Sequence, residues 1–516
     1  MKKKYITSRT AIIVLLFLVL VSCKKDMGNY SYKDINDAKI SGIESLYTTL
    51  RGEKLSISPQ LAFTQDQSAD TSKYTYQWLS LDPKSSPTVS RVIATTRNLN
   101  WTVDLASTDK TYTIYYTVKE KSTGVIWKKV FNLLVNTNIS DGWVILNETD
   151  NSNARLDYLN YSAATNSFQY YQDILLAFST LRLKGKPQMV QFYQRRDVFS
   201  GKSGRSVLVG TDQNTVVINT EDNTFSSYTD IINTMSNYFP PPYYAKSVRC
   251  QGGNLSYMYD NLGQLFFENP TSSIGYASAV NKLITGEAVN ISPMYAEGYM
   301  QSNNYALLYD VTRKRFMEHK NFNTSVSVPV APIATPSAPS LFDPGNIGMD
   351  LVYMASTPAI TAQTYALFKN NTGKLFLARM RCNSDSFVPL AFDEITTAAP
   401  MTGASQFAID PQQGYLLYAT GSKIYRYNVF DRSNAMVADY GSRKISLIKY
   451  QKMVYDPLKT RYAEYATKLI VCTYEEGNPS SSGKMDLYNV PNLNGDLSLY
   501  NSFSGMGKII DVTYRE

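Results

Sequence analysis

The sequence contains one histidine, His319, and four cysteines, Cys23, Cys250, Cys382 and Cys472. A zinc-binding HExxH motif needs two histidines and is therefore excluded. Any Ser-His-Asp triad would depend on His319, which lies in the charged stretch "RKRFMEHKNF" and is expected in a solvated turn. No two cysteines have CxxC spacing, and the three that follow Cys23 cannot all pair with one another. We expect most of these three to be small, buried hydrophobic residues.

Motifs for phosphate, nucleophile or calcium chemistry are incomplete. "GNPSSSGKM" at 477–485 has one residue too many for a Walker loop and places Met485 where magnesium would need a hydroxyl. No GxSxG elbow occurs, and "NETDNSNARLD" at 147–157 lacks the central glycine and final glutamate of a calcium loop. We therefore predict no catalytic residue, no metal site and no cofactor. A glycosidase-type pair of carboxylates from distant strands remains open among the 43 acidic residues.

The amino terminus has the pattern of a bacterial lipoprotein. Four basic residues in 1–10 precede the apolar run "AIIVLLFLVLV" at 11–21, which is shorter than the roughly 20 residues that span a bilayer and suits a secretory signal peptide. The following "LVSC" at 20–23 resembles a lipobox. We expect cleavage after residue 22, lipidation of Cys23 and a tether over 23–29. An uncleaved anchor with an incidental cysteine is the alternative.

Charge and the residues after Cys23 bear on the location of the protein. Removal of 1–22 leaves 47 basic and 43 acidic residues, a net charge of +4 in place of +8, which is too weak and dispersed to predict nucleic acid as a partner. Lys24 stands where an inner-membrane retention signal has aspartate. The "KKD" that begins at Lys24 weakly resembles the tether of surface lipoproteins of Bacteroidota. We therefore expect an outer-membrane lipoprotein on the periplasmic or surface face, with the surface favoured.

Residues 30–138 are predicted to form a small β-sandwich. "TYQWLSLD" and "YTIYYTVKEKSTGVIWKKVFNLLV" alternate apolar and polar residues, and the second stretch is interrupted by a tight turn at Ser122-Thr123-Gly124. "TYTIYYTVKEKSTG" resembles the closing strand of PKD-type immunoglobulin-like domains, with Trp78 in the place of their core tryptophan. The Gly-Asp-Gly turn of those domains is replaced by "LSLDPKS", so the resemblance is to the wider PKD-like group.

Residues 139–516 contain a repeat. "TNSFQYYQDI" at 165, "DNTFSSYTDI" at 222 and "DSFVPLAFDEI" at 385 share a polar turn, a phenylalanine, and an acid followed by isoleucine. The first two copies are about 57 residues apart, and the longer interval to the third fits about three periods of 54 with two diverged copies between.

Seven hairpin-like segments support the same period. They begin at Gly142, Ser206, Leu255, Tyr305, Tyr365, Gly414 and Lys468, and each joins two apolar strands through a turn rich in Asn, Asp or Gly. Seven units over 139–516 correspond to about 54 residues each, the length of a four-stranded blade. The sequence therefore predicts an all-β chain: a PKD/Ig-like sandwich followed by a β-propeller, with seven blades favoured over six or eight. The terminal "KIIDVTYRE" is expected to pair with the first blade and close the ring.

The lipobox, the sandwich that opens with "GNYSYKDINDAKISGI" and the tyrosine-rich repeat that begins "SDGWVILNE" together resemble the PKD-like family lipoproteins of Bacteroidota. The resemblance covers nearly the whole chain, and its motifs are structural. It implies an accessory surface protein associated with a SusC/SusD-type uptake system for glycans or peptides. It implies no catalytic residues.

One loop is a candidate ligand-binding site. "SNYFPPPYYAKS" at 236–247 places Tyr238, Phe239, Tyr243 and Tyr244 around three prolines that would stiffen an extended loop. Aromatic faces held in this way could stack on sugar rings or grip a peptide. The alternative is a connection that packs its aromatic side chains onto the neighbouring blade. Binding of a nutrient polymer or an uptake partner is the function we expect, and a propeller hydrolase or lyase, or a scaffold without ligand, remain alternatives.

The anchor prediction is tested by the mass of the mature amino terminus. In a bacterial host that processes lipoproteins, the full chain should begin at an acylated Cys23 and enter the detergent phase on partitioning, because several buried acyl chains hold it in the bilayer. The Cys23→Ala variant should carry no lipid, whereas the control Lys25→Ala should be lipidated normally. A mature wild-type chain that retains 1–22 and has no lipid on Cys23 would contradict the prediction.

Overall fold

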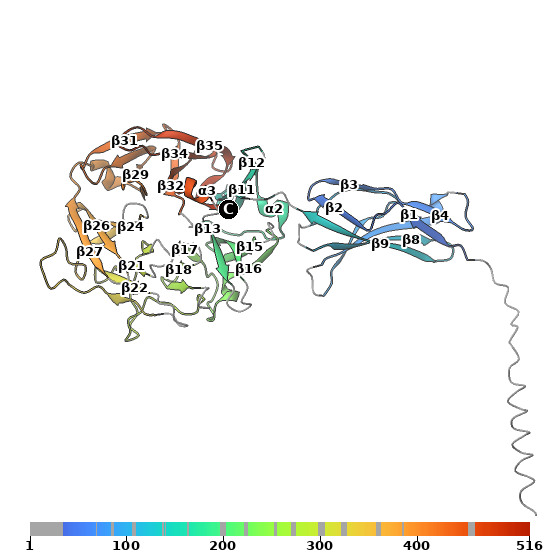
Figure 1. The fold of residues 1–516 in the computed structure, drawn as a ribbon, viewed down its shortest axis with the longest axis horizontal. Coiled ribbons are helices and arrows are strands. Elements are labelled where there is room, and N and C mark those ends of the chain that lie inside the picture. Colours follow the sequence, from blue (N-terminus) through green and yellow to red (C-terminus); the bar gives the residue numbers. More distant parts are fainter. Residues whose placement is uncertain are drawn as a thin grey trace, which may run out of the picture. The chain divides into compact units, whose positions relative to one another are not determined.

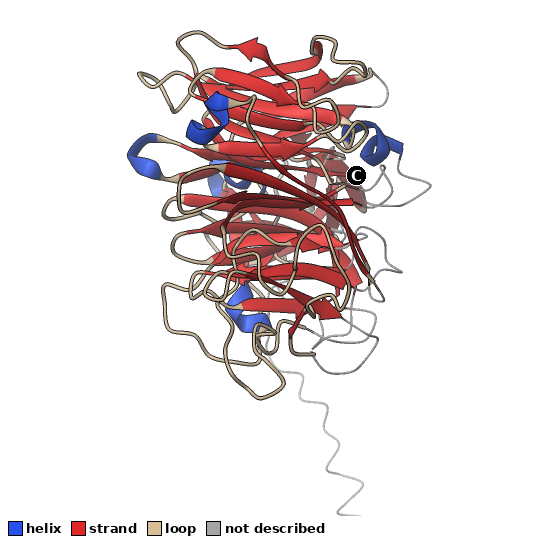
Figure 2. Ribbon diagram, turned by 90° about the vertical axis from the view of Figure 1, so that its left-hand side faces the viewer, coloured by secondary structure: helices blue, strands red, loops and turns tan. Residues whose placement is uncertain are grey.

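The structure is a computed structural model that describes residues 35–68, 70–83, 87–105, 110–136, 139, 141–162, 165–196, 203–220, 225–251, 255–269, 275–297, 305–320, 328–357, 363–383, 386–452 and 460–516. The predicted signal peptide, Cys23 with its tether, and residues 30–34 of the predicted sandwich lie outside this part of the chain. The fold is all-β, as the sequence predicts, and Figure 2 shows strands with only short helical segments.

The chain divides into two compact units. Unit 1 falls within 1–49, 53–103 and 110–133, and unit 2 within 50–52, 104–109 and 134–516. The helical segments are η1 (Thr71–Lys73), η2 (Asp150–Ser152), α2 (Ile174–Phe178), η3 (Ile231–Thr234), η5 (Ala399–Gly403) and α3 (Thr460–Tyr465). Across the described residues, no helix combines the length and the apolar composition needed to cross a bilayer.

Unit 1 is built from antiparallel strands. They are β1 (Ala38–Ser41), β2 (Leu46–Leu50), β3 (Lys54–Ile57), β4 (Gln60–Phe63), β5 (Tyr74–Leu81), β6 (Ser90–Ala94), β7 (Leu99–Thr102), β8 (Tyr112–Glu120) and β9 (Ile126–Asn136). Five of them form one sheet in the order β2-β9-β8-β5-β6, and β1-β4 and β3-β7 form pairs. Strands β8 and β9 are the predicted hairpin around Gly124. Trp78 on β5 is fully buried with its ring 4.3 Å from that of Tyr116, as expected for a core tryptophan.

Unit 2 contains seven antiparallel sheets among the described residues, arranged in a ring (Figure 1). The first combines β36 (Lys508–Arg515), β10 (Gly142–Glu148), β11 (Ala154–Ser162) and β12 (Ser167–Tyr171) in that order. The next three are β13 (Pro187–Arg196), β14 (Ser203–Thr211), β15 (Thr215–Asn219) and β16 (Ser227–Asp230); β17 (Ala245–Gln251), β18 (Leu255–Asp260) and β19 (Leu265–Glu268); and β20 (Ala296–Glu297), β21 (Tyr305–Asp310), β22 (Arg315–Lys320) and β23 (Ala331–Pro332).

The last three sheets each have four strands in chain order. They are β24 (Asp350–Ser356), β25 (Gln363–Lys369), β26 (Leu375–Cys382) and β27 (Phe387–Glu394); β28 (Gln406–Ile409), β29 (Leu416–Thr420), β30 (Lys423–Tyr427) and β31 (Asn434–Asp439); and β32 (Lys444–Tyr450), β33 (Lys468–Tyr474), β34 (Gly483–Asn489) and β35 (Ser498–Met506).

All seven predicted hairpins are antiparallel strand pairs in the structure, from β10-β11 to β33-β34. The three copies of the phenylalanine motif lie at the outermost strands β12, β16 and β27. The two sheets between β16 and β27 explain the long interval to the third copy. One of them has a two-residue outer strand, β23, and the other has no fourth strand among the described residues.

Strand β36 pairs with β10, so the end of the chain completes the first sheet as predicted. Trp143 lies opposite Tyr514 in this ladder, and hydrophobic clusters lie between each sheet and the next, including the last and the first. The inner strand of each sheet contacts the inner strand of the next around the ring. The arrangement is propeller-like, and it leaves a space bounded by inner strands.

Closure can be tested at Trp143, which is fully buried with its ring about 5 Å from those of Tyr465 and Tyr514. Trp143→Ala should lower the free energy of unfolding by about 3–5 kcal/mol, because it empties a packed site between three elements. The control Leu493→Ala, at a side chain 90% exposed, should change it by less than about 0.5 kcal/mol. Urea unfolding of both variants measures this, and equal effects would contradict the packing described.

Candidate functional site

A cavity of about 370 Å³ lies within the ring of unit 2. Its walls come from the inner strands β13, β17, β24, β28, β32 and β36, from residues just after β24, β28 and β32, and from Ala466 after α3. This size falls in the range of small-ligand pockets. The lining combines basic, polar and aromatic side chains with one carboxylate.

The acidic member of the lining is Asp511 on β36, and among the described lining residues it is alone. Its carboxylate accepts hydrogen bonds from Lys449 Nζ at 2.7 Å, from the Val190 amide at 3.0 Å and from the Val512 amide at 2.9 Å. These bonds join β32, β13 and β36. Asp511 is therefore engaged by the protein itself, and the described lining offers no second carboxylate to form a glycosidase pair.

Aromatic side chains form one wall of the cavity. Tyr353 on β24 and Phe407 on β28 have ring centroids 5.7 Å apart and planes inclined by 30°. Both are half-buried, so part of each ring is available to a ligand. Tyr450 on β32 donates a hydrogen bond to Asp410 Oδ2 at 2.8 Å, and burial raises the pKa of both groups. Tyr450 thus supports the wall, while Tyr353 and Phe407 present ring surface.

Hydroxyl and amide groups also line the cavity. Ser247 Oγ on β17 is buried at the wall and has no hydrogen-bond partner among the described residues. Ser356 Oγ lies 2.9 Å from Thr364 Oγ1, and Gln451 Oε1 accepts from the Tyr514 amide at 3.0 Å. Gln188 on β13 adds a further amide to the lining. The cavity is therefore suited to a ligand with many hydrogen-bonding groups.

The structure places the four aromatic residues of the 236–247 loop in different environments. Phe239 and Tyr243 stack on each other with centroids 4.3 Å apart and are buried in a cluster shared by the β13 and β17 sheets. Their ring faces cannot meet a ligand, which corrects the binding role proposed for these two and matches the packing alternative. Tyr238 is 81% exposed and Tyr244 is half-buried, so these two remain candidates.

The expectation that His319 lies in a solvated turn is wrong. His319 is on β22 with no exposed surface, and its Nδ1 lies 2.7 Å from Tyr257 Oη and its Nε2 2.9 Å from the Val328 carbonyl oxygen. Alternation along β22 turns this residue into the core, which the flanking charged residues conceal in the sequence. Burial lowers the pKa of His319 to about 4. The imidazole is therefore neutral near pH 7 and enclosed by protein, so it cannot act as a base at the surface.

The cysteines and acidic groups that the structure describes supply no metal site. Cys250 and Cys472 are buried, Cys382 is half-buried, and burial raises the pKa of the Cys382 and Cys472 thiols. Within the described ranges, no three His, Cys, Asp or Glu side chains gather into a group that could hold a metal ion.

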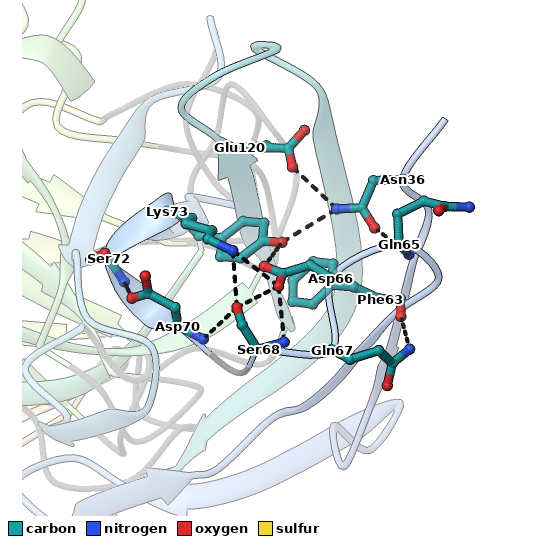
Figure 3. A network of polar contacts seen from close by, with 11 residues as sticks. Asn36, Phe63, Gln65, Asp66, Gln67, Ser68, Asp70, Ser72, Lys73 and Glu120 are labelled. Atoms are coloured by element: carbon teal, nitrogen blue, oxygen red, sulfur yellow. Dashed lines mark hydrogen bonds and ion pairs between the residues drawn. The ribbon is translucent and has the colours of Figure 1, made fainter. Parts of the chain in front are cut away.

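A second hollow, of about 280 Å³, lies in unit 1 and is lined in part by Phe63, Tyr74 and Arg97. Figure 3 shows the polar network beside it, in which Asp66 accepts hydrogen bonds from Ser68, from Lys73 at 3.2 Å and from Tyr74 at 2.9 Å. The bonds from Ser68 are the main cause of a pKa well below the usual range for Asp66. The network orders the segment between β4 and β5, and its carboxylate is already satisfied.

Comparison with known proteins adds family context for the first part of the chain. Residues 23–187 match the sequence model of the PKD-like family, a span that extends beyond the predicted sandwich and takes in β10 to β12. No curated protein sequence matches the chain.

Comparison with solved structures finds several similar chains at low identity. A quinonprotein alcohol dehydrogenase-like protein from Bacteroides thetaiotaomicron is 12% identical, with a TM-score of 0.47 over 91% of this chain and 94% of that one. The extracellular domain of a one-component system from the same organism is 12% identical, with a TM-score of 0.35 over 94% of this chain and 71% of that one. Similarity at this level says nothing about ligand or activity.

The environment of His319 predicts its titration. Because the folded pKa of about 4 lies below the ordinary value of 6.5, the unfolded chain binds a proton first as the pH falls. This histidine should therefore stabilise the fold fully above pH 6.5, and about 2 kcal/mol of that stability should be lost between pH 7 and 5.

The chain has one histidine, so an untagged protein with a labelled imidazole gives a single NMR signal. In the folded protein the signal should remain that of neutral imidazole at pH 5, whereas in urea it should titrate near pH 6.5. A folded-state midpoint near 6.5 would contradict the buried placement.

Proposed function

We propose that this protein is a surface lipoprotein that binds a nutrient polymer, either a glycan or a peptide, or a partner in a SusC/SusD-type uptake system. The observation that carries the proposal is the cavity in the ring of unit 2. It combines ring surface from Tyr353 and Phe407 with hydroxyl and amide groups, and its described lining has no carboxylate pair. Such a surface can hold a polar ligand without offering the acids that hydrolysis requires.

In this proposal the ring is a seven-bladed β-propeller over residues 139–516. The seven sheets of the described residues, the β10-β36 ladder and the hydrophobic clusters between successive sheets support that count. Residues 30–138 act as a PKD-like spacer, which the family match over 23–187 supports. Lipid on Cys23 anchors the chain in the outer membrane, and the spacer lets unit 2 reach a ligand outside the membrane surface.

A hydrolase or lyase is the second candidate, and a scaffold without ligand is the third. An enzyme of the glycosidase type would place two carboxylates about 5 to 9 Å apart at the cavity. Asp511 is held by Lys449 and two backbone amides, so it would need both release and a partner. These requirements favour recognition over turnover. The protein needs no cofactor for this role, and nucleic acid is not expected as a ligand.

The soluble chain from Lys24 onward should bind members of a glycan and peptide array without converting them. Tyr353→Ala and Phe407→Ala should each weaken binding of a ligand about fivefold to tenfold, because each removes a stacking face worth about 1 to 1.4 kcal/mol. Tyr238→Ala and Tyr244→Ala test the loop in the same assay, and calorimetry with product analysis of each hit measures both affinity and turnover.

The outcomes separate the candidate functions. Loss of affinity in the two cavity variants, with unchanged melting temperatures, supports recognition at the cavity, whereas loss only in Tyr238→Ala or Tyr244→Ala would move the site to the loop. Converted ligand would overturn the binding role in favour of an enzyme. Absence of any hit would favour the scaffold.

A further inference from the structure

Basic side chains outnumber acidic ones in the described lining of the cavity. Lys246 and Arg249 come from β17, Lys449 from β32, and Lys452 follows β32, against Asp511 alone. The Lys449–Asp511 ion pair at 2.7 Å neutralises one pair of charges. Beyond this pair the described lining has three further basic residues, Lys246, Arg249 and Lys452, and a concave site of low dielectric strengthens the field of such charges.

Two of these cations differ in how they are held. Arg249 donates to the Tyr295 carbonyl oxygen, and its guanidinium lies over the Tyr295 ring at 4.7 Å from the centroid. This fixes the guanidinium in one place before any ligand arrives, which lowers the entropic cost of binding. Lys246, in contrast, is exposed, and its charge interacts electrostatically with the Asp260 carboxyl without an ion pair between the two. Its ammonium group can turn toward an anion at the cavity.

The other lining residues favour a sugar over a peptide as the negatively charged ligand. The unpartnered hydroxyl of Ser247 and the amide of Gln188 lie on strands next to the cations, and the Tyr353–Phe407 wall offers ring surface. A sugar ring presents hydroxyl groups at its edge and an apolar C–H face to an aromatic ring, so it uses all three features at once. An acidic peptide would use the cations and leave many of the hydroxyl and amide groups without partners.

We propose that the cavity binds an acidic saccharide, a sugar whose ring carries a carboxylate, with Lys246 and Arg249 contacting the carboxylate and the Tyr353–Phe407 wall contacting the ring. This inference rests on the proposed binding function and names its ligand class. Charge-assisted hydrogen bonds to Lys246 and Arg249 supply the preference for the acid over a neutral sugar of the same shape.

The test compares uronic-acid oligosaccharides with their neutral counterparts. The probes are oligomers of galacturonate, glucuronate, mannuronate and guluronate, each beside a preparation in which the carboxylates have been reduced to alcohols. At least one acid should bind the chain from Lys24 onward, and its reduced form should bind at least about tenfold more weakly. Because the charges are partly exposed, affinity for the acid should also fall as salt rises from about 0.05 to 0.5 M.

Two matched variants test whether the preference for the acid depends on a lysine of the cavity. Lys246→Gln should weaken binding of the acid several-fold and leave binding of the reduced form unchanged. The control Lys282→Gln removes an exposed lysine that does not line the cavity and should change neither. Both variants should have the melting temperature of the wild-type protein, which would exclude misfolding as the cause of a lost affinity.

Equal binding of acid and reduced forms, still weakened by Tyr353→Ala, would overturn this inference and leave the proposed binding function standing. Failure of every acid to bind would also overturn it. Triglutamate that binds as tightly as the best uronate, with the same loss in Lys246→Gln, would assign the cavity to acidic peptides and contradict the saccharide.

Discussion

The structure of unit 2 depends on how the innermost strands satisfy backbone groups that no ladder pairs. Among the described residues no backbone ladder joins one sheet of the ring to the next, so amides at the inner edges need other acceptors. Side chains supply the acceptors. Asp511 accepts from the Val190 amide at 3.0 Å, and Thr513 Oγ1 accepts from the Phe192 amide at 3.2 Å. The side chain of Gln406 likewise accepts from the Ile448 amide at 2.7 Å and donates to Ser446 O.

Strand β36, the last strand, makes several of these contacts. Strand β36 pairs with β10, supplies Asp511 and Thr513 to β13, and ends at Arg515, which is fully buried. The Arg515 guanidinium donates to the Thr220 carbonyl at 2.9 Å and to Tyr158 Oη at 3.2 Å. A buried guanidinium is stable only when its donors are satisfied, so this residue fixes the end of the chain against two sheets. The cavity depends on the same contacts, because β36 forms part of its wall.

Much of the fold could be predicted because it follows from local patterns. Each hairpin joins apolar strands through a turn with its own chemistry: the Asp260 carboxylate accepts from the amides of Leu262 and Gln264, and the Asn370 side chain does the same for Thr372 and Lys374. These patterns repeat along the sequence and can be counted.

The site could not be predicted in the same way, because it has no local pattern. Its lining comes from residues as distant in the sequence as Gln188 and Asp511, which belong to six of the seven described sheets of unit 2, and only the closed ring brings them together. The burial of single side chains also could not be predicted from the neighbouring residues alone. The prolines around Phe239 and Tyr243 suggested an exposed loop, yet these rings fill the space between two sheets, and only Tyr238 and Tyr244 reach solvent.

We propose that this cavity, and not the aromatic loop or unit 1, receives the ligand without converting it. A crystal structure of the chain from Lys24 onward with a bound acidic oligosaccharide tests the claim most directly. We expect an intact ligand inside the ring, with a sugar ring against Tyr353 and Phe407 and a carboxylate near Lys246. Electron density for the ligand at Tyr238, in the hollow of unit 1 or as a cleaved product would contradict it.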